Sequence, residues 1–317
     1  MKKRFCFLIL VLILTFSACS EPNTEISSVP PKESQSEELI EFTDALGQAF
    51  ALDRPERVVT IIGSFADIWC LAGGEDVLVG TANDAWESFG LELGEQVTNL
   101  GSAMKPSLEL ILAAQPDLVI ASSISPSNLE MREAFEQAKI PAAYFDVASF
   151  EDYLELLEIC TRLTGRPENY ITFGSEIQER VAKAVACQDE SHPTVLSLQV
   201  SGSSCKVKNS EGNVLGEMLA ALGCVNVADR DGALLEDLSL EAIIAADPDY
   251  IFAVFHGTDT AEAQANLEAT LLSNPAWSNL RAVREGQFYT LDRRHYSLKP
   301  NALWGEAYEK LSEILYG

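Results

Sequence analysis

The sequence has few basic residues and few histidines, and both scarcities limit the functions open to it. Its 317 residues include 22 lysines and arginines against 48 aspartates and glutamates, which gives a formal net charge of −26 at pH 7. Nucleic acids are bound mainly through cationic surfaces, so this composition excludes a nucleic-acid-binding protein with a general basic face. The three histidines, His192, His256 and His295, lie far apart in the chain, so it has no histidine-rich loop for free zinc.

Motifs of the common enzyme classes are also absent. The chain has no G-x-S-x-G nucleophile elbow, no phosphate-binding P-loop and no H-E-x-x-H zinc motif. None of its seven cysteines has a partner at C-x-x-C spacing, so zinc or thioredoxin-like chemistry lacks support. We therefore expect a protein that is not an enzyme, and a surface module for adhesion or ligand sensing stays open as an alternative to a transport role.

The N-terminal segment has the pattern of an export signal. Residues 2–4 are basic, residues 5–16 are almost wholly apolar, and the small residues Ser17 and Ala18 follow. The apolar run is too short to span a bilayer as a finished helix. We therefore predict that residues 1–18 are a signal peptide that is removed on export.

Residues 16–19, Phe-Ser-Ala-Cys, resemble a bacterial lipobox, in which the cysteine is lipidated and becomes the first residue of the mature protein. This resemblance implies that Cys19 anchors the protein to the outer face of the cytoplasmic membrane, because two acyl chains anchor stably. Plain secretion with unmodified Cys19 is the alternative. Residues 19–39 are rich in serine, glutamate and proline, which is typical of a disordered tether.

Five cysteines follow the proposed lipid site, and they are Cys70, Cys160, Cys187, Cys205 and Cys224. An odd number argues against a complete disulfide framework, so we expect most of them to be small buried apolar residues. A bridge between Cys205 and Cys224 stays open.

Short apolar segments alternate with helix-period segments from residue 40 onward, which is typical of parallel sheets flanked by helices. Strands are predicted at 57–62, 77–81, 117–121, 142–146, 194–200, 249–255 and 287–291. Helices are predicted at 127–138, 151–163, 212–221 and 302–315.

One long helical pattern, residues 168–188, separates two groups of predicted strands. We interpret the segment 167–190 as a rigid strut between an N-terminal lobe, 40–166, and a C-terminal lobe, 191–317. The alternative is an ordinary crossover helix within a single sheet.

An internal repeat supports two similar lobes. Ser107–Asp117 and Ser239–Asp249 are identical at eight of eleven positions, at an offset of 132 residues. In each copy the serine is the expected N-cap and the glutamate, Glu109 or Glu241, lies in the first helical turn, where the helix dipole favours a negative charge. Two similar lobes that face each other would form a cleft, which is the usual place for a ligand.

The two copies of the repeat and three further stretches resemble the Fe-complex and cobalamin class of bacterial solute-binding proteins, over nearly all of residues 41–317. The matching stretches are Thr43–Gly47, Pro55–Val59, Leu108–Val119, Ser239–Ile251 and Ala282–Tyr289. The resemblance implies two α/β lobes joined by one long helix, the class III fold of periplasmic binding proteins, with small closure motions. It also implies a monomer that delivers an iron complex or a corrinoid to an ABC importer.

The same resemblance assigns a docking role to Glu109 and Glu241, which would meet arginines of the importer's permease. The alternative is that each glutamate only stabilises the helix on which it lies.

The loops that follow the predicted strands should line the cleft. The basic residues Lys105, Lys206, Lys208, Arg293, Arg294 and Lys299 all fall in or next to these loops. They indicate a basic cleft for an anionic ligand, such as haem propionates or siderophore carboxylates, against the alternative of scattered surface charge. The predicted ligand-binding residues are Ser64, Phe65, Trp86, Lys105, Lys206, Lys208, Arg293, Arg294 and Tyr296, whose aromatic members could equally be packing residues.

Residues 101–106, Gly-Ser-Ala-Met-Lys-Pro, resemble the G-x-x-M-x-P loop of haem-receptor lipoproteins from Gram-positive bacteria. This resemblance implies that Met104 is one axial ligand of a haem iron and that His256, in a His-Gly turn, is the other. A thioether and an imidazole from opposite lobes would give a six-coordinate iron. Haem is therefore the favoured ligand. A ferric siderophore, bound through Lys206, Arg293 and Arg294, and cobalamin are the alternatives.

Overall fold

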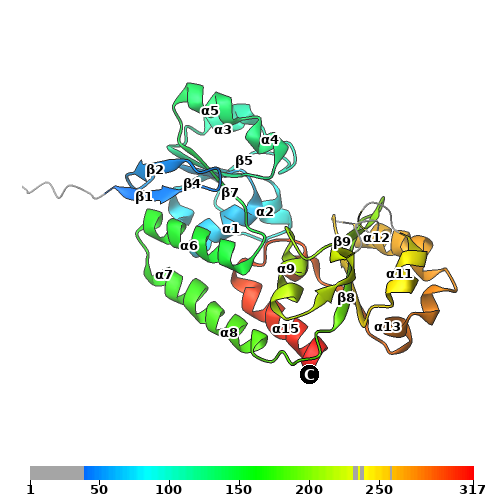
Figure 1. The fold of residues 1–317 in the computed structure, drawn as a ribbon. Coiled ribbons are helices and arrows are strands. Elements are labelled where there is room, and N and C mark those ends of the chain that lie inside the picture. Colours follow the sequence, from blue (N-terminus) through cyan, green and yellow to red (C-terminus); the bar gives the residue numbers. More distant parts are fainter. Residues whose placement is uncertain (1–38, 231–234, 236–238, 258) are drawn as a thin grey trace, which may run out of the picture. The chain divides into compact units, whose positions relative to one another are not determined.

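The computed structural model describes residues 39–230, 235, 239–257 and 259–317 (Figure 1). The predicted signal peptide 1–18, the lipid site Cys19 and all but the last residue of the predicted tether 19–39 lie outside the described residues. Residues from Glu38 to the C-terminus form one compact unit. Within the described part of the chain, no helix is long and apolar enough to cross a membrane.

The N-terminal lobe is built on a parallel sheet with the strand order β5-β4-β3-β6-β7. Its strands are β3 (Val58–Thr60), β4 (Leu78–Thr81), β5 (Thr98–Asn99), β6 (Leu118–Ser122) and β7 (Ala142–Phe145). All residues of β3, β6 and β7 are buried, as expected for parallel strands covered on both faces. Its helices are α1 (Gly63–Leu71), α2 (Asp84–Glu87), α3 (Leu108–Ala113), α4 (Pro126–Leu129), α5 (Arg132–Ala138) and α6 (Phe150–Thr164), with a 3-10 turn at Glu75–Val77.

An antiparallel hairpin, β1 (Ile40–Thr43) and β2 (Ala49–Leu52), precedes this sheet. Asp44 fixes the hairpin in place. Its Oδ1 accepts from the backbone N–H groups of Leu46 and Gln48, and its Oδ2 accepts from Tyr144 N on β7 at 3.0 Å. A single carboxylate thus closes the turn and joins the hairpin to the edge of the sheet.

The C-terminal lobe has a second sheet, in which β10, β8, β11 and β12 are parallel and β9 is antiparallel to β8. Its strands are β8 (Thr194–Val200), β9 (Cys205–Lys208), β10 (Val225–Asn226), β11 (Tyr250–Phe255) and β12 (Phe288–Leu291). Its helices are α9 (Val214–Ala221), α11 (Leu240–Ala246), α12 (Thr260–Leu267), α13 (Arg281–Arg284), α14 (Arg293–Tyr296) and α15 (Trp304–Tyr316), with shorter turns at Val227–Asp229, Glu268–Leu272, Trp277–Asn279 and Asn301–Leu303.

One continuous helical segment joins the two lobes. It consists of α7 (Glu168–Tyr170), a π-helical turn (Ile171–Ser175) and α8 (Glu176–Val185), and it runs beside α6 and α15 (Figure 1). Gly165, at φ +69°, ends α6 in a left-handed conformation and lets the chain turn into the linking helix. The predicted fold class, two α/β lobes joined by one long helix, is confirmed, whereas the division at residues 40–166, 167–190 and 191–317 stays a prediction.

One hydrophobic cluster extends through both lobes, and each lobe has a further cluster of its own. The shared cluster includes Trp69 of α1 and Tyr153 of α6 together with Phe252 of β11. The ring of Phe150 on α6 lies 5.8 Å from that of Trp304 on α15. Because close-packed interiors resist deformation, this shared core opposes a wide separation of the lobes.

The structure corrects the expectation of a single helix over 127–138. The segment forms α4 and α5, which are interrupted at Glu130 and Met131. The short strands β5, β9 and β10 and the hairpin were not predicted, whereas all seven predicted strands are present to within two residues at each end.

All five described cysteines are free, so the Cys205–Cys224 bridge is not formed. Cys205 lies opposite Val200, at one end of β8, whereas Cys224 precedes Val225, which lies opposite Thr194 at the other end. A disulfide needs α-carbons within about 7 Å, and the length of β8 separates these two.

Candidate functional site

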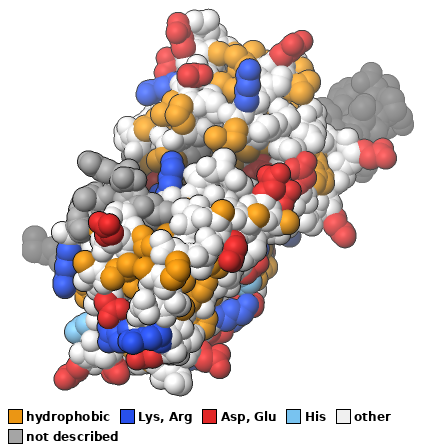
Figure 2. Space-filling model, turned by 90° about the vertical axis from the view of Figure 1, so that its right-hand side faces the viewer, with side chains coloured by type: hydrophobic (Ala, Val, Ile, Leu, Met, Phe, Trp, Pro, Cys, Tyr) orange, Lys and Arg blue, Asp and Glu red, His pale blue; other side chains and the backbone are white. Residues whose placement is uncertain are grey.

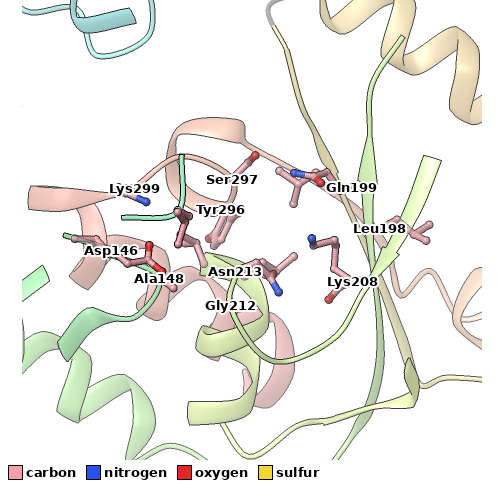
Figure 3. Close-up of a pocket in the computed structure, with 16 residues that line it drawn as sticks. Asp146, Ala148, Leu198, Gln199, Lys208, Gly212, Asn213, Tyr296, Ser297 and Lys299 are labelled. Atoms are coloured by element: carbon pink, nitrogen blue, oxygen red, sulfur yellow. The ribbon is translucent and has the colours of Figure 1, made fainter. Parts of the chain in front are cut away.

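A cavity of about 210 Å³ lies where the loop after β7 meets the C-terminal lobe (Figure 3). The N-terminal lobe contributes Ile124 and residues 146–148 to its wall. The C-terminal lobe contributes residues from β8, the last residue of β9, the start of α9, and the segment that includes Tyr296, Ser297 and Lys299. The cavity is therefore built by both lobes, in the place where the sequence predicts a cleft.

Two lysines, Lys208 at the end of β9 and Lys299 in the segment after α14, line this cavity. In the part of the chain that the structure describes, the Nζ atom of neither lysine has a hydrogen-bond or ion-pair partner. Burial lowers the pKa of Lys299, although the nearby carboxylates of Asp146 and Asp152 act in the opposite direction. Asp146 also lines the cavity, and its Oδ1 is buried without a hydrogen-bond partner.

His256 stands beside this cavity rather than in its wall. Its Nδ1 lies 3.4 Å from Nε2 of Gln199 and 3.4 Å from Oγ of Ser297, and both of these residues line the cavity. Burial, with smaller contributions from Arg293 and Lys208, lowers the pKa of His256. The imidazole is therefore neutral at pH 7, which is the form that binds metal ions.

Met104 lies on the segment before α3 and does not line the cavity. Its side chain is 84 % exposed, and its backbone N–H donates to Oγ of Ser102 at 3.3 Å. Lys105, the next residue, is also exposed. The structure therefore does not bring Met104 into the wall that lies beside His256, and the axial pair stays a prediction.

Comparison with known proteins identifies the family. Residues 58–295 match the family of periplasmic binding proteins. The chain belongs to this family. It is 27 % identical over 302 residues to the Fe(3+)-citrate-binding protein YfmC of Bacillus subtilis, with 90 % of this chain and 87 % of that protein covered.

Two solved structures from Staphylococcus aureus share the fold. IsdE complexed with heme matches with a TM-score of 0.66 and 18 % identity, and the match covers 82 % of this chain and 99 % of that one. SirA complexed with staphyloferrin B matches with a TM-score of 0.65 and 21 % identity, and the match covers 87 % and 97 % of the two chains. Because the identities are this low, these similarities concern the fold.

Several predicted ligand-binding residues of this periplasmic binding protein belong to its core. Phe65 is 1 % exposed, because α1 turns its ring into the core shared by the lobes. Ser64 is also buried, and its carbonyl accepts from Asn301. Trp86 is half-buried and packs against the same core. Tyr296 is buried too, with its hydroxyl donating to Ala307 O at 3.1 Å, but it also lines the cavity.

The two predicted arginines connect the lobes instead of lining the cavity. Arg294 donates through Nη2 to Asp67 at 2.8 Å and through Nη1 to the carbonyl groups of Lys299 and Pro300. Its guanidinium also lies 4.5 Å from the ring centroid of Phe89. Arg293 donates from Nη1 to Oγ of Ser88 at 3.4 Å. Both were predicted as ligand contacts because they follow a predicted strand. Their partners, more than 200 residues away, could not be found from local sequence.

The sequence did not identify Gln199, Ser297 and Asp146 as site residues. No local motif marks them, and only the packing of the two lobes brings them to the cavity. Lys206 lies two residues before Lys208 on β9 and is exposed, outside the wall of the cavity.

Glu109 and Glu241 occupy equivalent positions in the two lobes. Oγ of Ser107 caps α3 by accepting from Leu110 N, and Oγ of Ser239 caps α11 by accepting from Ala242 N. Both glutamates follow their cap by two residues and both are exposed. Figure 2 shows that acidic side chains are spread over both halves of one face of the molecule. The two glutamates are therefore available to a partner, and their docking role stays a prediction.

Proposed function

We propose that this protein is the extracytoplasmic substrate-binding component of an ABC importer, and that its ligand is an iron complex. The observation that carries the proposal is the cavity between the lobes, into which two lysines without described partners extend on an otherwise acidic protein. Membership of the periplasmic binding proteins and the similarity to an Fe(3+)-citrate-binding protein support the choice of ligand. We do not assign a catalytic function.

Uptake of iron tests the proposal. Deletion of the gene should reduce accumulation of radioactive iron supplied as the cognate chelate, and the wild-type gene should restore it. An adhesion or sensor module, the alternative of another class, would leave iron uptake unchanged. If deletion leaves the uptake of every ferric chelate, haem and cobalamin unaltered, the transport function is wrong.

We also propose that lipidated Cys19 holds the protein on the outer face of the cytoplasmic membrane and that the mature chain is a monomer. The protein should incorporate a labelled fatty acid, and globomycin should block the removal of residues 1–18. Cys19→Ser should release the protein into the medium. A wild-type protein that is unlabelled and freely secreted would contradict the anchor, and light scattering measures the oligomeric state.

Haem is a second candidate ligand, because His256 beside the cavity is exposed and its pKa is lowered. In this case His256 and Met104 would ligate the iron from opposite lobes, as the sequence predicts. Titration of the protein with haem should then give a six-coordinate low-spin spectrum that is lost in both Met104→Ala and His256→Ala. The absence of any shift in the Soret band would exclude haem and leave a ferric siderophore, a ferric carboxylate or cobalamin.

A further inference from the structure

We propose that Lys208 and Lys299 form a two-lysine subsite that binds the carboxylate groups of a small ferric polycarboxylate chelate. This inference rests on the proposed function and specifies its substrate class. Three features of the cavity point to this ligand, namely its charge, the helix α9 that begins at its wall, and its size.

The two lysines reach one cavity from separate parts of the C-terminal lobe. Lys208 is the last residue of β9, and Lys299 lies in the segment that connects α14 to α15. In Figure 3 the side chain of Lys208 extends into the cavity from one side, and Lys299 lies across it, near Asp146. Both side chains therefore belong to the lining of one cavity and approach it from different sides.

Neither ammonium group forms an ion pair with a described residue, although Asp146 and Asp152 lie close enough to Lys299 to favour its charged form. Asp146 is the one carboxylate among the residues that line the cavity, so the lining retains a net positive charge. Leaving ammonium groups unpaired in a partly buried site is costly, and a ligand carboxylate would remove this cost through charge-assisted hydrogen bonds.

The first turn of α9 adds to the positive potential. Val214 and Leu215, the first two residues of this eight-residue helix, line the cavity beside Gly212 and Asn213. The N-terminal end of a helix carries a partial positive charge that favours an anion. Part of this end is already occupied, because Oδ1 of Asn213 accepts from Gly216 N and Glu217, in the first turn, accepts from Gly212 N. The side chains of Gln199 and Ser297 supply neutral donors on the other side of the same cavity.

The volume restricts the kind of anion. Pockets that enclose drug-sized ligands measure about 300–1,000 Å³, whereas this cavity measures about 210 Å³. Its wall is also divided between polar and apolar residues rather than forming a flat apolar slot. Small size and several cationic donors together favour a compact chelate with several carboxylates over a broad aromatic macrocycle.

Direct binding measurements test the subsite. The protein purified from membranes is titrated in a calorimeter with ferric citrate, iron-free citrate, a ferric trihydroxamate without carboxylates, and haem. We expect ferric citrate to bind, and Lys208→Gln and Lys299→Gln each to weaken this binding about tenfold to a hundredfold, which corresponds to the loss of one charge-assisted hydrogen bond. Lys183→Gln, an exposed change of the same charge on α8 outside the cavity, should change the affinity less than about twofold.

The possible outcomes separate the subsite from the proposed function. Tight binding of the trihydroxamate or of haem, with ferric citrate excluded, would overturn the subsite and leave the iron-importing function intact. Unchanged ferric citrate binding in both lysine variants would also overturn it. If no iron compound binds and deletion leaves iron uptake unaltered, both proposals fail. Lys299→Met, which keeps the length of the buried side chain, and thermal melting of each variant separate a loss of binding from a loss of folding.

Discussion

The carboxylate of Asp67 and the guanidinium of Arg294 meet between the two lobes at 2.8 Å. Asp67 belongs to α1, and its Oδ2 also accepts from Nδ2 of Asn301, which in turn donates to Ser64 O. Burial raises the pKa of Asp67, against the opposing effects of Asn301 and Arg294, and burial lowers the pKa of Arg294 against the attraction of Asp67. Desolvation therefore offsets much of the attraction, so the pair specifies how the lobes meet more than it adds stability.

We predict that breaking this pair from one side costs more than removing it altogether. Arg294→Met should reduce the free energy of unfolding by about 3–5 kcal/mol, because it leaves the charge of Asp67 buried without its partner. In the double variant with Asp67→Asn, a large part of that stability should return. Urea denaturation of the two single variants and the double variant measures the coupling.

The exposed pair Arg132 and Glu136 on α5 provides the matched control, since its side chains are 48 % and 64 % exposed. Arg132→Met should cost no more than about 0.5 kcal/mol. If the losses in free energy of unfolding of the two single variants add up to the loss in the double variant, the inferred coupling between Asp67 and Arg294 is wrong.

The Arg294 contact also shows what the sequence could and could not predict. Seven strands were predictable because most of them are short apolar runs that become buried, as in β6 and β11. The strands β5 and β10 have only two residues each, and their pairing depends on neighbours rather than on a pattern of their own. Arg294 was predicted as a ligand contact because it follows a predicted strand, and its actual partner, Asp67, lies 227 residues away in sequence.

The cavity was predictable only in outline. The internal repeat indicates two lobes and hence a cleft, and Lys208 was assigned to it because it follows a predicted strand. Gln199 and Ser297 have no distinguishing sequence context, and the packing of β8 against the segment after α14 brings them together. Phe65 was assigned to the cleft for the same reason as Lys208, but its ring faces the core.

Asp249 supports a second prediction, on acid stability. Its Oδ2 accepts from N and Oγ1 of Thr194, at 2.8 and 2.6 Å, and its Oδ1 pairs with Arg281 at 2.6 Å. The equivalent aspartate of the other lobe, Asp117, accepts from the N–H groups of Glu56 and Arg57. Burial acts to raise the pKa of Asp249, but the hydrogen bonds from Thr194 and the charge of Arg281 outweigh it and lower the pKa.

A carboxyl group with a lowered pKa in the folded state stabilises the protein above its unfolded pKa, about 3.9, and this stabilisation is lost as the pH falls through the folded value. Asp249→Asn should therefore destabilise the protein by about 1–3 kcal/mol at pH 7, and this difference should shrink below pH 4. Chemical denaturation at several pH values measures it. For Asp53→Asn, a change at an exposed position, the free energy of unfolding should vary with pH as it does in the wild type. If Asp249→Asn lowers the free energy of unfolding by the same amount at every pH, the proposed linkage to the pKa of Asp249 is wrong.

Docking to the permease gives a third prediction. Glu109→Ala combined with Glu241→Ala should leave the affinity for ligand unchanged but abolish most of the uptake, because the loss of a paired interfacial charge costs about 2–5 kcal/mol. Glu130→Ala with Glu285→Ala, which removes two other exposed charges from the same two lobes, should transport normally. Uptake by the first double variant at the wild-type rate would show that the two glutamates only stabilise their helices.

The lowered pKa of Lys299 predicts a pH dependence of ligand binding. A bound carboxylate favours the ammonium form, so binding requires a protonated Lys299 and is constant with pH below the pKa of the free protein. As the pH rises through that pKa, which lies below the usual lysine value of about 10.4, the affinity should fall. The other groups nearby do not reproduce this fall: Asp146 and Asp152 favour protonation of Lys299, and the lowered pKa of His256 places its own titration at acidic pH.

Calorimetric titration of ferric citrate from neutral to alkaline pH tests this dependence. Because the chelate itself changes with pH, the informative quantity is the difference between wild type and Lys299→Gln at each pH. This difference should be largest where Lys299 is protonated and should disappear as Lys299 loses its proton, whereas Lys183→Gln should follow wild type throughout. A difference that stays constant up to the usual lysine range would mean that Lys299 is not the group that titrates.

The stability of the unliganded protein should change with pH in the opposite direction to its affinity for ligand. Between the lowered pKa of Lys299 in the folded protein and its usual value in the unfolded chain, the unfolded chain binds more protons. The free energy of unfolding should therefore rise with pH in that interval, and Lys299→Met should remove the rise.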